Sequence, residues 1–287
     1  MKNVFFLVDN DGKFAAFMLN EEADKLISLK SDINALFNSP VLGYNSKDDI
    51  VYQFWANRDS HEVYYFDPKT DYAPTTAISS ISWDDPNFPN IEGFGVWAAK
   101  CNFTMGPDGK MYSRMLGGNL VRIDVENARG ENLTNGDLVG TKDGSAYGLV
   151  FDPQDENVFY FSNNDKHCIY KYDLRTKECA CWAGQEGKSG YLDGPIGQAM
   201  FNKPGQMCVD SEGNIILTDT ENHCIRKITM STGYVSTLAG KPQNSGYVNG
   251  SAEDAQFKKP LGICIDNDDV MYIGDSENRA IRRLAVE

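Results

Sequence analysis

The chain has 287 residues and a formal net charge of −14. Because neutralising a phosphate backbone needs clustered Lys and Arg, this charge argues against nucleic acid and anionic membranes as partners. No apolar run approaches the ~20 residues that a membrane span requires, so we expect no membrane insertion. The hydrophobic content of 41% is enough to fill a sizeable core.

The first part of the chain contains three weak copies of one strand pattern. In each copy a short polar turn with Asp or Gly separates apolar runs, which is typical of antiparallel hairpins. The turns are Asp9–Gly12, Ser46–Asp49 and Gly106–Gly109. They predict units that begin near Val4, Pro40 and Ala98.

An insertion at residues 80–97 interrupts this pattern between the second and third units. It is stiffened by prolines and carries four large aromatic residues, Trp83, Phe88, Phe94 and Trp97. Rigid aromatics suit stacking against a sugar or anchoring a protein partner. We therefore predict that these four residues bind a ligand. The alternative is that the insertion packs on itself and forms a lid over the centre of the fold.

Two arginines without counterparts in the repeat complete the candidate site. Arg58 and Arg114 are expected in the loops between the second and third strands of neighbouring units. Both are candidate ligand-binding residues that face the same pocket as the aromatics, and the alternative is that both are merely solvated.

The second part of the chain contains one motif written more than once. The run from Phe201 to Pro204 returns at Phe257 to Pro260, and Asp219-x-x-Asn222 returns as Asp275-x-x-Asn278, always 56 positions later (257 − 201, 275 − 219). A fixed period with strand patterns inside each copy is typical of repeat architectures. A third copy precedes these two, so units are predicted to begin near residues 146, 204 and 260.

Six such units predict an all-β fold, a six-bladed β-propeller of four-stranded antiparallel blades in a single domain, 1–287. In the fifth unit the third and fourth strands are expected at Cys224–Thr229 and Tyr234–Leu238. The sixth unit stops just after its third strand, so the last blade lacks its own outer strand. Because an open sheet edge is a liability, we expect this chain to be a segment of a longer protein whose preceding residues close the ring.

The polar residues that recur in the motif are expected to be structural. His61, His167 and His223 occupy one repeat position, and equivalent positions on different blades cannot converge to the ~2.0–2.1 Å that zinc needs. We expect each His to hydrogen-bond within its own loop. Asp219 and Asp275 are each expected to cap the amides of their own loop beside a nearby arginine.

No known catalytic motif is present, so no catalytic residue, metal ligand or cofactor is assigned. A calcium ion in the central channel remains an alternative, because the chain has many acidic loops.

The repeated segments resemble the NHL repeat, which is named for an Asn-His-Leu signature that reads Asn222-His223-Cys224 here. The resemblance is specific over roughly residues 147–284 and only architectural before them. It implies a likeness to the propeller domain of Bacteroides-type surface proteins, which carry an upstream Ig-like TIG domain. Unlike the RNA-binding members of the NHL group, whose binding face is basic, this chain is acidic.

The aromatic insertion, the acidic composition, the absence of a catalytic motif and the incomplete last blade together predict a non-catalytic binding module in an extracytoplasmic location, at the bacterial cell surface or in the periplasm. The rim of the propeller that carries its long loops (the long-loop rim) would present the site to a glycan or protein. The alternative is a metal-dependent hydrolase or lyase of the lactonase or amidating-lyase propeller type.

Overall fold

The computed structural model describes residues 4–8, 14–19, 26–33, 41–45, 50–56, 61–70, 74–79, 81–84, 104–114, 118–134 and 147–285. The chain divides into two compact units, Met1–Leu116 with Leu120–Asn132, and Gly117–Asn119 with Leu133–Glu287. The regular elements in the described residues are strands and three-residue 3-10 helices. None of the helices among them is long and apolar enough to cross a membrane.

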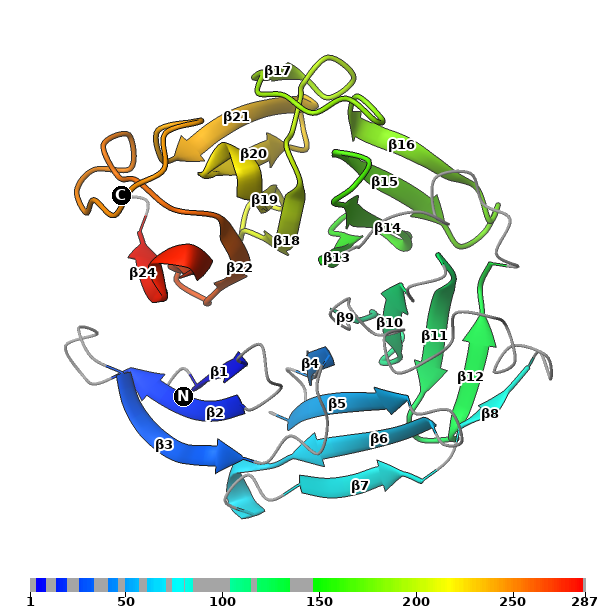
Figure 1. Ribbon diagram of the computed structural model, residues 1–287. Coiled ribbons are helices and arrows are strands. Elements are labelled where there is room, and N and C mark those ends of the chain that lie inside the picture. The colour runs from blue at the N-terminus through cyan, green and yellow to red at the C-terminus, as the bar shows by residue number, and fades with distance from the viewer. Residues whose placement is uncertain are drawn as a thin grey trace. The chain divides into compact units, whose positions relative to one another are not determined.

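The first unit contains three sheets (Figure 1). The first has the order β1-β2-β3, the second β4-β5-β6-β7 and the third β8-β12-β11-β10-β9. The strands are β1 (Val4–Val8), β2 (Phe14–Leu19), β3 (Leu26–Ile33), β4 (Val41–Asn45), β5 (Ile50–Ala56), β6 (His61–Phe66), β7 (Pro74–Ile78), β8 (Ser82–Trp83), β9 (Thr104–Met105), β10 (Met111–Arg114), β11 (Leu120–Asp124) and β12 (Arg129–Asn132).

The second unit also contains three sheets, with the orders β13-β14-β15-β16, β17-β21-β20-β19-β18 and β22-β23-β24. The strands are β13 (Leu149–Asp152), β14 (Asp155–Asn163), β15 (Cys168–Asp173), β16 (Cys179–Gly184), β17 (Gly194–Pro195), β18 (Pro204–Val209), β19 (Ile215–Asp219), β20 (Cys224–Thr229), β21 (Tyr234–Ala239), β22 (Pro260–Ile265), β23 (Met271–Asp275) and β24 (Ala280–Leu284). Two 3-10 helices, η3 (Thr220–Asn222) and η4 (Ser276–Asn278), connect the second and third strands of the last two sheets.

The predicted all-β fold with antiparallel sheets is confirmed, and the prediction for the fifth unit is close. β20 spans Cys224–Thr229 as predicted, and β21 runs one residue further than predicted, to Ala239. The exception to antiparallel pairing is the two-residue strand β8, which pairs parallel to β12.

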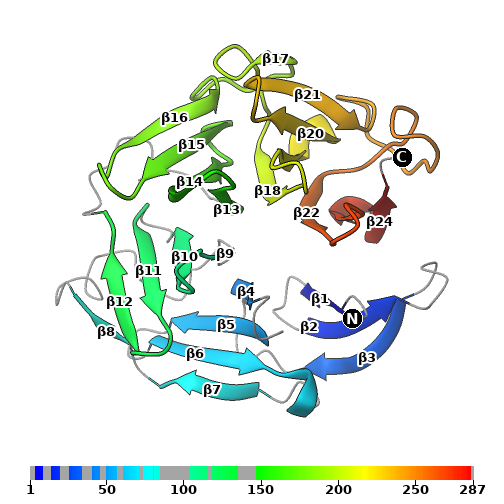
Figure 2. The same ribbon diagram turned by 180° about the vertical axis from the view of Figure 1, so that it is seen from behind.

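Among the described strands, the last sheet lacks an outer strand as predicted, but the first sheet contains three strands where four were predicted. Four sheets contain four or more strands, whereas the β1–β3 and β22–β24 sheets contain three each. Two sheets instead gain a short fifth strand, because β8 pairs with the outer edge of β12 and β17 with the outer edge of β21. Figure 2 shows both short strands at the outer edges of their sheets. The described strands therefore form four complete four-stranded blades, whereas six blades were predicted, the last of them without its outer strand.

The core of the second unit lies between neighbouring sheets. One apolar cluster joins Val150 and Ile169 of the β13–β16 sheet to Leu217 and Val235 of the next sheet, with Phe201 fully buried between them. A second cluster, around Phe257, joins that sheet to the β22–β24 sheet. A phenylalanine before each of the strands β18 and β22 therefore fills the space between two sheets.

Candidate functional site

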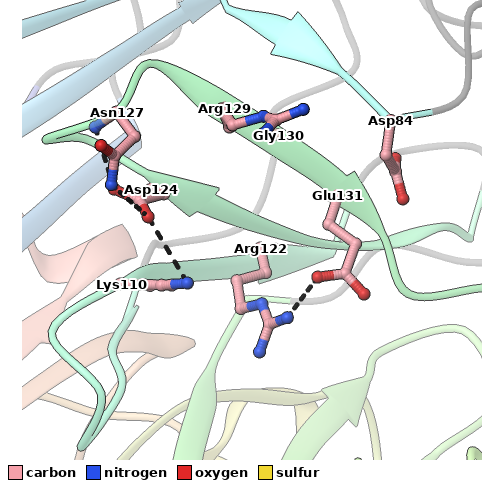
Figure 3. Close-up of a pocket in the computed structure, with 8 residues that line it drawn as sticks. All are labelled: Asp84, Lys110, Arg122, Asp124, Asn127, Arg129, Gly130 and Glu131. Carbon is pink, nitrogen blue, oxygen red and sulfur yellow. Dashed lines mark hydrogen bonds and ion pairs between the residues drawn. The ribbon is translucent and has the colours of Figure 1, made fainter.

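A polar hollow lies on the β8–β12 sheet (Figure 3). Its volume is about 640 Å³, and it opens to solvent on one side. The pairing of β11 with β12 places Arg122 opposite Glu131 and Asp124 opposite Arg129, so alternate residues of both strands face the hollow. The complete lining is Asp84, Lys110, Arg122, Asp124, Asn127, Arg129, Gly130 and Glu131.

The charges in the hollow largely neutralise one another. Lys110 Nζ lies 3.4 Å from Asp124 Oδ2, and Arg122 pairs with Glu131. Asn127 donates from its backbone and its side chain to Asp124, each at 3.0 Å, and the side-chain bond lowers the pKa of that carboxyl. The hollow thus offers paired hydrogen-bond donors and acceptors without a net charge. Such a lining suits a neutral, hydroxyl-rich ligand better than an ion.

Trp83 directly precedes Asp84, one of the residues that line the hollow. It lies in β8, opposite Gly130 of β12. A Cβ added at Gly130 would lie 2.5 Å from Cε3 of the indole, so Gly130 leaves the space that the ring occupies. Trp83 was expected on a free loop, and instead it is partly buried in an edge strand. Its packing on Gly130 fixes this one residue of the insertion on the outer strand β12.

Arg114 does not lie in a loop, which corrects the expectation. It is the last residue of β10, pairs in register with Leu120 of β11 and is 1% exposed. The strand pairing continues through this residue, so the connection to β11 begins only after it. Two strands, β11 and β12, separate β10 from the strand that carries Trp83. The remaining predicted site residues, Arg58, Phe88, Phe94 and Trp97, lie outside the described residues.

The sequence analysis missed the polar residues of the hollow. A signal was present in the run Leu120-Val-Arg-Ile-Asp, where Arg122 and Asp124 alternate with the buried Val121 and Ile123. Such alternation places both charges on one face of a strand. What the sequence did not supply was the register that brings Glu131 opposite Arg122.

The most deeply buried polar group in the second unit is centred on Asp219. Its Oδ1 accepts a hydrogen bond from the backbone N of Asn202 at 2.7 Å, and its Oδ2 accepts from Asn222 Nδ2 at 2.8 Å and Arg226 Nη1 at 2.7 Å. Arg226 Nη2 in turn donates to Leu192 O and to Asp193 Oδ1. The sequence predicted that Asp219 caps the amides of its own loop, and this is wrong. Asp219 instead connects segments before, within and after that loop.

The same group recurs 56 residues later. Asp275 accepts hydrogen bonds from Lys258 N, Asn278 Nδ2 and Arg282 Nη1 at 2.7, 2.8 and 3.0 Å. Arg282 Nη2 donates to Val248 O at 2.7 Å. All of these side chains hold the loop between two sheets in place. Their role is therefore structural, as the sequence predicted.

The motif histidines also connect neighbouring sheets. His167 Nδ1 accepts a hydrogen bond from Lys203 N at 3.1 Å, and His223 Nδ1 accepts one from Lys259 N at 3.2 Å. In both cases the donor directly precedes the inner strand of the next sheet, so the expectation of a bond within the same loop is wrong. Burial, together with Lys203, lowers the pKa of His167. The neutral imidazole that this bond requires is therefore favoured.

No group of three or more His, Cys, Asp or Glu residues in the described part of the chain could hold a metal ion.

Comparisons with known proteins place these features in a wider group. The NHL repeat model matches residues 201–228. The chain is 25% identical over 271 residues to SUPPRESSOR OF QUENCHING 1, a chloroplastic protein of Arabidopsis thaliana, and this match covers 88% of the chain and 25% of that protein. The chain therefore spans about a quarter of the length of this curated relative.

Two solved structures from Bacteroides thetaiotaomicron are similar over nearly the whole chain. A protein of unknown function matches with a TM-score of 0.79 at 22% identity, covering 100% of this chain and 68% of the other. An auxiliary nutrient binding protein matches with a TM-score of 0.73 at 22% identity, covering 99% and 66%. At this level of identity the likeness shows the fold, which is an all-β propeller with antiparallel sheets that contains an NHL repeat.

Proposed function

We propose that this protein is a non-catalytic, ligand-binding propeller whose site combines the polar hollow on the β8–β12 sheet with the aromatic insertion. The observation that carries the proposal is the position of the hollow. Asp84 lines it, Trp83 precedes Asp84, and the next residues in the chain lead to Phe88, Phe94 and Trp97. Aromatic residues and a polar hollow are thus neighbours in the sequence.

The size and lining of the hollow favour a glycan as its ligand. Its volume of about 640 Å³ falls within the roughly 300–1,000 Å³ that is usual for ligand pockets. Paired carboxylates, guanidinium groups and an amide offer many hydrogen bonds to hydroxyl groups, and aromatic rings offer apolar faces to a sugar. A protein ligand at the same hollow is the second form of this proposal.

The likeness to an auxiliary nutrient binding protein supports a binding role. We further propose that the six sheets are six blades of one ring, with the protein in an extracytoplasmic location and an Ig-like domain upstream. The acidic composition and the resemblance to Bacteroides-type surface proteins support these points.

The alternative of a metal-dependent hydrolase or lyase has no observation in its favour within the described residues. The buried Asp219, Arg226, Asp275 and Arg282 are all engaged in bonds that hold the loops between sheets.

The test is a thermal-shift screen of polysaccharides and their oligosaccharides, with calcium, zinc and EDTA in parallel. A ligand at a hundred times its Kd stabilises by about 2.7 kcal/mol, which corresponds to a Tm shift of about 5 °C for a chain of this size. We expect a glycan to give such a shift and the N127A/R129A double variant to abolish it. Both side chains are exposed, so folding should be unaffected.

The matched control is N244A/K188A, which removes an exposed amide and an exposed cation outside the hollow. It should retain the full shift. A glycan shift that survives in N127A/R129A would move the site away from the hollow. A shift with metal or EDTA, and none with any glycan, would overturn the binding-module proposal.

A further inference from the structure

Two cysteines share one face of the β13–β16 sheet. β15 pairs with β16 so that Cys168 lies opposite Gly184 and Tyr170 lies opposite Cys181. Because residues two apart on a strand point to the same face, Cys168, Tyr170 and Cys181 all point to one face of this sheet. Cys168 and Cys181 are therefore diagonal neighbours across the third and fourth strands, at a spacing from which side chains still reach each other.

The sulfur atoms of these two residues are in contact. Cys181 Sγ lies 3.8 Å from the carbonyl oxygen of Gly184, which is the residue directly opposite Cys168. The Cys168 thiol donates a hydrogen bond to Cys181. This bond raises the pKa of Cys168 and lowers the pKa of Cys181, because it holds the proton on the donor and stabilises a thiolate on the acceptor.

The next sheet carries only one of the two thiols. Cys224 lies 56 positions after Cys168 and is likewise 0% exposed. The residue 56 positions after Cys181 is Thr237, whose hydroxyl lies 2.7 Å from Tyr191 Oη. A buried cysteine at the position of Cys168 is thus ordinary for the repeat, whereas Cys181 departs from it and places a second sulfur beside the first.

The two thiols also differ in their access to solvent. Cys181 is partly exposed, whereas Cys168 is fully buried. In a reactive thiol pair, the accessible sulfur that ionises more easily attacks an incoming disulfide, and its neighbour then displaces the group that was attached. The exposure and the hydrogen bond assign the attacking role to Cys181 and the second role to Cys168.

We propose that Cys181 and Cys168 form a site of reversible oxidation, at which the Cys181 thiolate reacts with a small-molecule disulfide and Cys168 then closes a disulfide bond between β15 and β16. In the first step the Cys181 sulfur bonds to one sulfur of the small disulfide, whose S–S bond breaks and releases a thiolate. In the second step Cys168 loses its proton and its sulfur attacks that of Cys181, which releases the second thiolate. The protein gives up two electrons and two protons in total, and the small disulfide is reduced to two thiols.

The probe is oxidised glutathione, incubated with the full chain under native conditions. The remaining thiols are then blocked, and the peptides are mapped by mass spectrometry. We expect Cys168 and Cys181 to disappear together as free thiols and to be recovered in one disulfide-linked pair, which dithiothreitol reverses. The C168A variant should instead accumulate glutathione on Cys181, because the thiol that displaces it is missing. C224A removes an equally buried thiol from the next sheet and is the matched control, in which the bond should still form.

A second measurement does not require the bond to form. With iodoacetamide at neutral pH, Cys181 should be alkylated at least tenfold faster than Cys264, although Cys264 is the more exposed of the two. The C181T variant carries the residue that the next sheet has at this position, so it should fold and leave Cys168 unreactive.

Three results would each overturn the proposal. They are no oxidation of Cys181 by oxidised glutathione, a bond from Cys181 to Cys179 rather than to Cys168, and alkylation of Cys181 that is no faster than that of Cys264. These experiments do not involve the hollow, so their outcome is independent of the proposed function.

Discussion

Asp219 and Arg226 form an ion pair in which both side chains are 0% exposed, with Oδ2 and Nη1 separated by 2.7 Å. Burial raises the pKa of Asp219 to about 6, while Arg226 and the amide donors of Asn222 and Asn202 oppose that shift. The carboxylate is therefore the form present at neutral pH. It joins the buried guanidinium to the backbone of Asn202, in the segment before β18.

Replacing Asp219 with Asn should make the protein unfold far more easily, because Arg226 then loses its fully buried charge partner and keeps only the partly exposed Asp193. Loss of one member of a buried pair typically costs about 3–5 kcal/mol. Urea unfolding followed by circular dichroism measures the change. D268N, at an exposed aspartate, is the control and should alter the unfolding free energy by less than about 0.5 kcal/mol. Equal effects of the two variants would contradict the role of the pair.

The loop Gly190–Gly194 holds the outer strand β21 in place through Thr237. T237V keeps the shape of the side chain but removes the hydroxyl that meets Tyr191 Oη. We expect a loss of about 1 kcal/mol, whereas S236A, one residue away, should be near neutral. A double-mutant cycle with Y191F should show that the two losses are not additive. Additive losses would mean that the hydroxyl groups do not interact.

Gly130 leaves space for the indole of Trp83. In G130A the new Cβ would overlap the ring, so we expect a loss of about 1–3 kcal/mol from overpacking and a shifted tryptophan emission. The W83L background should remove most of the penalty. If G130A costs the same in both backgrounds, the ring is not what excludes a side chain at this position.

The His167 bond predicts a loss of stability in mild acid. The pKa of His167 is lowered on folding, so the folded state binds this proton less readily than the unfolded state. Its contribution is present above the unfolded pKa of about 6.5 and is lost as the pH falls through the folded pKa. Protonation of Nδ1 would also remove the acceptor for Lys203 N.

Urea unfolding at pH 7.5, 6.5 and 5.5 tests this sign. The wild type should lose more stability over this range than H167N, which has no titrating group. A wild type whose stability rises toward pH 5.5 relative to H167N would contradict the assignment.

The fold was predictable where the sequence repeats, and the site was less so. Identical spacing at Phe201 and Phe257 predicted the strands that follow them, because local alternation and a repeated pattern agree there. The sequence could not show that His167 bonds to the next sheet, because Lys203 lies 36 residues away. It also placed Arg114 in a loop, because the length of a hairpin depends on cross-strand pairing. The hollow was missed for a related reason, since its lining requires the register between β11 and β12.

The loop of residues 185–201, which follows the β13–β16 sheet, determines where the protein can be cut for engineering. Residues 185–201 follow the β13–β16 sheet in the chain, but β17 pairs with β21 and Asp193 bonds to Arg226, so they belong physically to the sheet after them. A cassette for grafting or exchanging one blade should therefore be cut just after Gly184 and just after Gly240, which carries the incoming loop along with the strands it clamps. A cassette cut at the first residue of each inner strand would separate Arg226 from Asp193 and should fold poorly.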